Sequence, residues 1–164
     1  MFACNQGGHF SQMMALNELF GKYDSILVTD NVRATKEMEA LIEVGVIVQV
    51  HAMSDRRKAL KGKRRTTSRR DVMTAYVKLF FECLKIWKKY RPKVIVSTGS
   101  NIAVPLFMIG KVFGSKLIFI ETRAKVYSKS LTGKIIGGIS DNIYVQWPEM
   151  KSIYPCAEYF GTLV

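Results

Sequence analysis

The first residues whose types could do chemistry are two glycines followed by a histidine, Gly7-Gly8-His9. They lie between a short apolar run and a helical pattern. Residues 2–5 predict a strand, Gly7 and Gly8 a sharp turn, and the apolar spacing after them a helix over about 10–22. Free N–H groups at a helix start suit phosphate or diphosphate. His9 stands at the mouth of this turn, and histidine is the side chain that most often serves as a general base, so it is a candidate for that role.

The glycine turn has two alternative interpretations. It lacks the full G-x-G-x-x-G pattern, and Asp30, which follows the second predicted strand, is not preceded by such a turn, so a dinucleotide-dependent oxidoreductase is the weakest hypothesis. Alternatively, Gly7 and Gly8 provide turn geometry alone, and His9 simply caps its helix.

Three further polar clusters follow predicted strands: Thr98-Gly99-Ser100, Glu121-Thr122-Arg123 and Gln146-Trp147. In open parallel sheets, ligands bind outside the carboxyl ends of the strands, so we expect these clusters to converge with His9. Glu121 could orient His9, bind a sugar hydroxyl or act as the base itself, and the Arg123 guanidinium suits a diphosphate. Both residue types also have a structural alternative: Glu121 could form an ion pair with a lysine, and Trp147 could belong to the hydrophobic core.

The elements that must position these clusters alternate between strand and helix. This order predicts an α/β fold: a Rossmann-like open parallel sheet with right-handed crossovers and helices on both faces, in one domain over 1–164. The strands are expected at 2–5, 25–29, 46–50, 93–97, 116–120 and 142–146. Helices are expected at about 10–22, at 71–90, from a few residues before Pro105 to about 113, and within 128–138, with a loop or helix over 31–43 and a last short helix after residue 148.

Positive charge is concentrated in one segment, which we predict to be a mobile loop over 54–70. Residues 56–70 contain nine basic residues and no acidic one, so they supply nine of the 12 net positive charges, and we expect an anionic partner such as a membrane surface. The basic residues are Arg56, Arg57, Lys58, Lys61, Lys63, Arg64, Arg65, Arg69 and Arg70. Nucleic acid is disfavoured, because aromatic residues are not interleaved with these charges.

The helix predicted over 71–90 carries an apolar arc that is wider than a surface helix needs. We expect most of this arc to be buried against the sheet, with some aromatic side chains left for contact with lipid.

The cysteines and the hydropathy of the chain limit which metal sites, disulfides and membrane segments are expected. Cys4, Cys83 and Cys156 form no C-x-x-C pair, so neither a metal site nor a disulfide framework is indicated, and a reducing cytoplasm fits. We expect no signal peptide and no membrane span, since the chain begins with a strand and contains no apolar run of about 18 residues.

Together, the motifs resemble the PssD-type polysaccharide-biosynthesis family. That family is similar to the membrane-side subunit of the eukaryotic two-subunit N-acetylglucosaminyltransferase of dolichol-diphosphate glycan assembly. The resemblance covers nearly the whole chain. It rests, in order, on Gly7-Gly8-His9 with Gln12, Ser97-Thr98-Gly99 with Ala103-Val104-Pro105, Ile120-Glu121 with Ser130-Leu131-Thr132-Gly133-Lys134, and Val145-Gln146-Trp147 with Tyr154-Pro155 and Gly161.

The resemblance implies a fold equivalent to the N-terminal, acceptor half of a GT-B glycosyltransferase. It further implies a separate donor-binding subunit, a UDP-sugar donor, no other cofactor, and a polyprenyl-diphosphate-linked sugar acceptor at the cytoplasmic face of the membrane, where this chain would attach peripherally. His9 and Glu121 would be the catalytic residues. The residues expected to bind the acceptor or its diphosphate are Gly7, Gly8, Gln12, Thr98, Gly99, Ser100, Arg123, Thr132, Gly133, Gln146 and Trp147.

A non-catalytic alternative accompanies this hypothesis. In it, the chain only recruits and enhances a partner that holds every catalytic group. Substitution of His9 separates the two hypotheses, because a pure membrane anchor would keep turnover.

Overall fold

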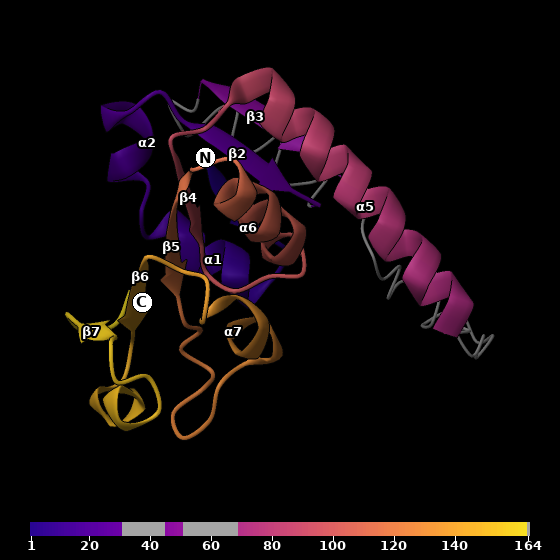
Figure 1. Ribbon diagram of the computed structural model, residues 1–164. Helices are drawn as coiled ribbons and strands as arrows, with labels where there is room; N and C mark the ends of the chain where they lie inside the picture. The colour runs from indigo at the N-terminus through magenta and orange to yellow at the C-terminus, as the bar shows by residue number, and fades with distance from the viewer. Residues whose placement is uncertain (31–44, 51–68, 164) are drawn as a thin grey trace, which may run out of the picture.

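The computed structural model describes residues 1–30, 45–50 and 69–163. Seven strands of these residues form one parallel sheet in the order β3-β2-β1-β4-β5-β6-β7 (Figure 1). The order reverses between β1 and β4, which makes a topological switch point there. The strands are β1 (Phe2–Cys4), β2 (Ile26–Thr29), β3 (Val46–Gln49), β4 (Val94–Ser97), β5 (Lys116–Ile120), β6 (Asn142–Val145) and β7 (Glu158–Tyr159).

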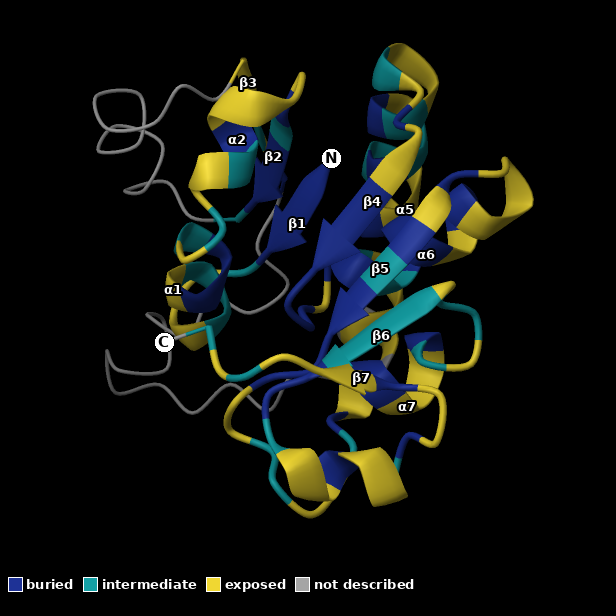
Figure 2. Cartoon of the chain, turned by 90° about the vertical axis from the view of Figure 1, so that its left-hand side faces the viewer, coloured by how far each residue is buried: buried dark blue, intermediate teal, exposed yellow. Residues whose placement is uncertain are grey.

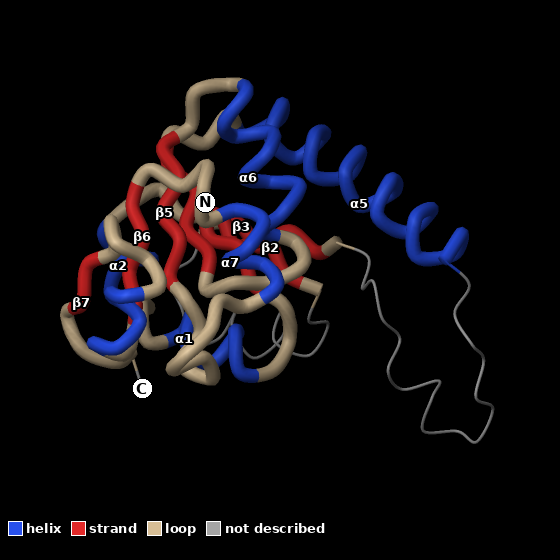
Figure 3. The backbone as a smooth tube through the Cα atoms, turned by 60° about the horizontal axis from the view of Figure 1, so that its bottom comes forward, coloured by secondary structure: helices blue, strands red, loops and turns tan. Residues whose placement is uncertain are grey.

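Helices cover both faces of the sheet, as predicted. Figures 1 and 3 show α1 and α2 on one face and α5, α6 and α7 on the other. The helices are α1 (Gly8–Met14), α2 (Glu18–Lys22), α5 (Arg69–Tyr90), α6 (Ala103–Val112) and α7 (Leu131–Ile136), followed by the 3₁₀ helix η1 (Pro148–Ser152). The predicted Rossmann-like α/β class is therefore confirmed.

Alternation along the central strands divides the buried side chains between two cores. Ala3, Ile95 and Phe119 face α5–α7, whereas Phe2 and Val96 face α1 and α2. The central strands are buried along most of their length (Figure 2). Burial on both faces explains why these strands read as continuous apolar runs in the sequence.

The single helix expected over 10–22 is wrong, because the chain breaks it into α1 and α2. Between them, the Leu16 N–H donates to the Met13 carbonyl at 3.0 Å, a tighter turn than the α-helix allows. This turn brings Phe20 into the core, where its ring packs edge-on against Phe2 at 4.6 Å between centroids. The apolar spacing continues through the break, so periodicity alone could not detect it.

Two other boundaries differ from the prediction. Arg69 and Arg70, assigned to the basic loop, begin α5 instead. Strand β7 was not predicted; it has two residues and pairs with the end of β6, and so short a strand shows no periodicity. The rest of the basic segment and the loop or helix expected over 31–43 lie outside the described residues.

Helix α5 is only partly buried, so the expectation of burial for most of its apolar arc is wrong. Leu79, Cys83 and Ile86 are buried, whereas Met73 and Val77 are exposed. Figures 1 and 3 show the reason: α6 lies beside the C-terminal half of α5, and the N-terminal half extends past the sheet. None of the described helices combines the length and the apolar content needed to cross a bilayer.

All three cysteines are free thiols. Cys4 and Cys83 are buried, and burial raises the pKa of each of these two thiols to about 12, whereas Cys156 is exposed. Cys4 and Cys83 therefore behave as small apolar side chains, and Cys156 is the accessible thiol.

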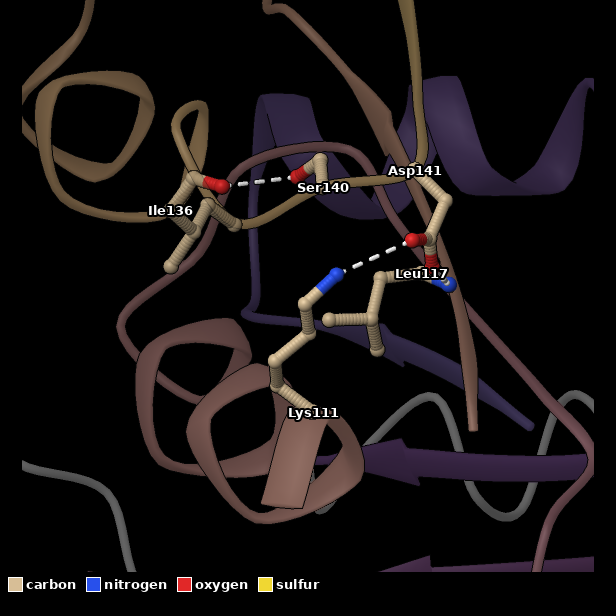
Figure 4. A network of polar contacts seen from close by, with 5 residues as sticks. All are labelled: Lys111, Leu117, Ile136, Ser140 and Asp141. Carbon is tan, nitrogen blue, oxygen red and sulfur yellow. Dashed lines mark hydrogen bonds and ion pairs between the residues drawn. The ribbon is translucent and has the colours of Figure 1, made fainter. Parts of the chain in front are cut away.

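Asp141 fastens the start of β6 at the amino-terminal edge of the sheet (Figure 4). Its carboxylate accepts hydrogen bonds from the Leu117 N–H (2.7 Å) and from Lys111 Nζ (3.0 Å). The neighbouring Ser140 hydroxyl donates to the Ile136 carbonyl at 2.7 Å, which ties the end of α7 to the same connection. The bond from Leu117, then the one from Lys111, hold the pKa of Asp141 below its ordinary value.

We expect Asp141→Ala to lower the free energy of unfolding by about 1 kcal/mol, chiefly through the bond to the Leu117 N–H. The Lys111 pair adds little because both side chains are well exposed. Since the folded-state pKa is depressed, this stabilisation is complete above about pH 4 and is lost as the pH falls through the folded-state pKa. Urea unfolding at pH 7 and pH 3 measures the effect, with exposed Asp24→Ala as control; an equal loss at both pH values would contradict it.

Candidate functional site

The four predicted polar clusters lie at the carboxyl ends of β1, β4, β5 and β6, which are consecutive neighbours in the sheet. The convergence expected from the sequence is therefore present. The first two clusters flank the switch point between β1 and β4, the place in open α/β sheets where ligands bind.

The first glycine turn is open to solvent. Gly7 has φ of 97°, a left-handed conformation that favours glycine, and its carbonyl accepts from the N–H groups of Phe10 (2.9 Å) and Ser11 (3.1 Å). Gly8 is exposed, and a Cβ built on either glycine would meet no atom within 4 Å. A ligand can therefore approach the backbone of this turn closely.

His9 is fixed by a reciprocal pair of bonds to Thr98. His9 Nδ1 lies 2.8 Å from the Thr98 carbonyl oxygen, and the Thr98 hydroxyl donates to the His9 carbonyl at 2.9 Å. Because a carbonyl can only accept, Nδ1 carries the hydrogen, and Nε2 of the neutral ring keeps a free lone pair. The half-buried imidazole is thus oriented to accept a proton through Nε2.

The second glycine turn packs against that ring. Gly99 also has a left-handed φ, of 90°, and a Cβ on it would lie 3.7 Å from His9 Cε1 and 3.4 Å from Phe119. The turn is held by Ser97, whose hydroxyl accepts from the Gly99 N–H (3.2 Å) and donates to the Ala3 carbonyl (2.7 Å). The turns after β1 and β4 therefore form one rigid corner.

Ser100 is distinctive in this corner. Its hydroxyl is the one buried side-chain polar atom, within the part of the chain that the structure describes, that has no hydrogen-bond partner. Buried polar groups are nearly always paired, so this unpaired hydroxyl, in the turn before α6, is a candidate partner for a ligand that reaches the corner.

Sequence reasoning missed a brace beneath the two turns. Asn5 Nδ2 donates to Asp30 (2.7 Å), Asp30 also accepts from the Gln6 N–H (2.8 Å), and the Ile102 N–H donates to Asn5 Oδ1 (3.4 Å). The available signal for this brace was the position of Asp30, directly after the strand next to β1. From the sequence, Asp30 was considered only as a possible ligand of a dinucleotide ribose. The brace fixes both turns relative to β2.

Glu121 lies inside the protein. Only 1% of its surface is exposed, and its carboxylate accepts from the Tyr154 hydroxyl (2.7 Å), the Thr122 N–H (2.9 Å) and the Ser130 N–H (3.1 Å). Burial and, next, the bond to this carboxylate raise the pKa of Tyr154. These bonds tie the segment after β5 to α7 and to the C-terminal turn.

Gln12 and Gln146 are also buried and bond to each other. Gln146 Nε2 donates to Gln12 Oε1 (2.6 Å) and to the Glu121 carbonyl (2.9 Å), and its Oε1 accepts from the Leu163 N–H (3.0 Å). Gln12 Nε2 donates to Thr122 Oγ1 at 3.3 Å. The pair therefore connects α1 with β5, β6 and the C-terminal segment.

Thr132 and Gly133 are buried at the start of α7, where the Ser130 hydroxyl accepts from the Gly133 N–H at 2.9 Å. A Cβ on Gly133 would collide with the Tyr154 hydroxyl and the Glu121 carboxylate, so glycine is needed here for close packing. The residues predicted around α7 thus stabilise the site from within.

Arg123 and Trp147 form the rim of the site. The indole N–H of the half-buried Trp147 donates to the Arg123 carbonyl at 2.8 Å, and the Arg123 side chain is exposed. Gly7, Gly8, His9 and Arg123 are accordingly predicted groups with surface that a ligand can reach, and the unpaired Ser100 hydroxyl lies buried behind them. Within the described residues, His, Cys, Asp and Glu side chains form no group of three that could hold a metal ion.

Comparison with known proteins places the chain in a family. The family described as "Oligosaccharide biosynthesis protein Alg14 like" matches residues 3–163. Similar curated proteins are UDP-N-acetylglucosamine transferase subunits ALG14. The one from Yarrowia lipolytica is 35% identical over 91 residues (52% of this chain, 42% of the relative), and the human one is 30% identical over 83 residues (46% and 38%). The matched segments span less than half of these relatives.

Solved structures support the fold. The chain is similar to MurG from Acinetobacter baumannii, with a TM-score of 0.69 at 11% identity, over 98% of this chain and 44% of that one. It is also similar to a putative UDP-N-acetylglucosamine 2-epimerase from Listeria monocytogenes, with a TM-score of 0.61 at 8% identity, over 92% and 40%. In both, this chain corresponds to less than half of a longer chain, which is consistent with one half of a GT-B fold. The chain thus belongs to the Alg14-like family of oligosaccharide-biosynthesis proteins.

Proposed function

We propose that this chain is the acceptor- and membrane-side subunit of a two-component glycosyltransferase, which moves a sugar from a UDP-sugar to a polyprenyl-diphosphate-linked acceptor. One observation carries the proposal: at the switch point, between two glycine turns, His9 Nδ1 bonds to the Thr98 carbonyl, which leaves Nε2 as the proton-accepting nitrogen of the neutral ring. This corner joins a candidate base to groups suited to an anion, as deprotonation of a sugar hydroxyl beside a diphosphate requires.

In the proposed reaction, an acceptor hydroxyl attacks the anomeric carbon of the donor sugar. His9 Nε2 takes the hydroxyl proton as the new glycosidic bond forms, and the bond to UDP breaks with its electron pair leaving on the nucleotide. The backbone of Gly7 and Gly8, the Ser100 hydroxyl and the Arg123 guanidinium bind the acceptor diphosphate. No cofactor is needed besides the donor itself.

Glu121 takes a different role from the one first expected. Since its carboxylate is buried and accepts three protein hydrogen bonds, we assign it as a positioning residue that holds the segment carrying Arg123. Gln12 and Gln146 position α1, and with it His9, in the same way.

The partner that this function requires is a donor-binding subunit. The relatives are named as subunits, and the domain corresponds to less than half of MurG, so a second domain must close the cleft over the UDP-sugar. We infer that the chain works peripherally at the cytoplasmic face of a membrane. The basic residues of 56–70 favour it, since each contributes about 1 kcal/mol near an anionic surface.

A reconstituted transfer assay tests this function. The chain, its candidate partner, membranes and a panel of labelled UDP-sugars are mixed, and label is counted in the lipid extract. We expect label only when both proteins are present. Label that appears with the partner alone would reduce this chain to a recruiting factor, and RNA binding without any label would refute the transferase.

A further inference from the structure

Helix α5 presents an apolar stripe that the fold does not cover. Met73, Val77 and Phe81 follow one another at i, i+4 and i+8, and Phe80 lies beside them on the same face. Their exposed fractions are 65%, 48%, 56% and 36% in that order. The opposite face, with Leu79 and Cys83, is buried against the domain. Contiguous exposed apolar side chains of this size on a folded domain indicate a contact surface.

Charge identifies what this stripe contacts. Exposed Lys78 and Lys85 border the stripe on one side, since Lys78 lies three positions before Phe81 and Lys85 four positions after it, the spacings of neighbours on a helix surface. In sequence, α5 holds six basic and two acidic residues, and the segment before it is more basic still. An apolar stripe bordered by lysines is the pattern of a helix lying in the interface of an anionic bilayer. A second copy, carrying the same positive charge, is repelled from this face.

The direction of α5 places the stripe near the proposed site. The C-terminal end of α5 leads through residues 91–93 into the amino end of β4, so its N-terminal half points toward the carboxyl ends of the strands. Figure 1 shows this half projecting from the body of the domain. The stripe and the His9 corner therefore belong to the same end of the molecule.

From these observations, we propose that the stripe of Met73, Val77, Phe80 and Phe81 inserts into the interfacial layer of an anionic membrane. The inserted helix holds the carboxyl ends of the strands toward the bilayer, where a diphosphate on a lipid lies at headgroup depth. The inference rests on the proposed function for its purpose, but the insertion itself needs neither the partner subunit nor an acceptor.

Vesicle sedimentation tests the insertion. The probe is vesicles of phosphatidylcholine with and without phosphatidylglycerol. We expect Met73→Ser, Val77→Ser and Phe81→Ser together to lower the partition coefficient on anionic vesicles by more than tenfold, because three exposed apolar side chains lose their burial. The matched control replaces three exposed apolar residues elsewhere, Tyr23, Val112 and Phe160, by serine and should bind like the unmodified chain.

A fluorescent label distinguishes insertion from charge attraction alone. In a Cys156→Ser background, Val77→Cys carries an environment-sensitive dye, while buried Cys4 and Cys83, with raised thiol pKa values, stay unlabelled. We expect anionic vesicles to shift the emission to the blue and brominated lipid to quench it, with no change for a label at Phe160→Cys. A dye that stays in water on bound vesicles, or a serine triple variant that turns a dimer into a monomer, would overturn the proposal.

A water-soluble, short-chain acceptor separates this inference from the proposed function. The serine triple variant should transfer sugar to that acceptor at the unmodified rate. Normal vesicle binding by the triple variant would sink the insertion alone, whereas transfer that fails for the unmodified chain would sink the proposed function alone.

Discussion

We expect His9→Asn to lower the rate of sugar transfer by about 10²–10⁴-fold, the range that a general base contributes. The asparagine amide can replace Nδ1 as donor to the Thr98 carbonyl, so the corner should keep its geometry. What is lost is Nε2, the atom assigned to take the acceptor proton. Turnover of the reconstituted two-protein enzyme measures the effect.

Stability and acceptor binding serve as controls for this result. The free energy of unfolding should change little in His9→Asn, and the binding of a diphosphate-linked acceptor should persist. His9→Ala, which also removes the donor to Thr98, should lose both turnover and some stability. Full turnover in His9→Asn would assign the base to the partner subunit and leave this chain as a recruiting factor.

The second large effect concerns Glu121. We expect Glu121→Ala to lower the free energy of unfolding by about 3 kcal/mol or more, because it removes a buried acceptor from three donors and leaves them unpaired. Gly133→Ala should destabilise the same place through collision with the Tyr154 hydroxyl and the carboxylate. Urea unfolding of each variant provides the measurement.

Matched variants decide between positioning and catalysis. Tyr154→Phe removes one of the three donors and should cost about 1–3 kcal/mol, while Glu158→Ala, at an exposed glutamate, should be neutral. If Glu121 were the base, its substitution would abolish turnover without loss of stability, and Tyr154→Phe would leave stability unchanged. That pair of results would contradict the positioning role.

The sheet and its covering helices could be predicted from the sequence, because hydrophobic periodicity and turn residues are both local signals. The alternation of apolar runs with helical patterns determines the parallel sheet, and turn residues after each strand show which side of the sheet carries chemistry. The convergence of the His9 and Thr98 clusters followed from that order alone. Two short features could not be predicted from the sequence. Strand β7 has only two residues, and the break between α1 and α2 depends on one tight turn.

The roles of individual site residues could not be predicted in the same way, because they depend on which direction each side chain faces. Glu121 and Gln146 have the residue types of a ligand site, yet both turn inward and bond to other parts of the protein. Burial of α5 was overestimated for a related reason, since a helical pattern shows an apolar face but not how much of the helix a neighbour covers. Asn5 and Asp30 were missed because their brace joins two strands that are 25 residues apart.

Binding of an acceptor to this chain alone is the most direct test of the account. The probe is farnesyl-diphosphate-linked N-acetylglucosamine, titrated calorimetrically without the partner subunit. We predict saturable binding that inorganic pyrophosphate competes away, that Ser100→Ala weakens, and that a UDP-sugar leaves unchanged. Binding of the UDP-sugar instead, with none of the acceptor probe, would contradict the assignment of this chain to the acceptor side.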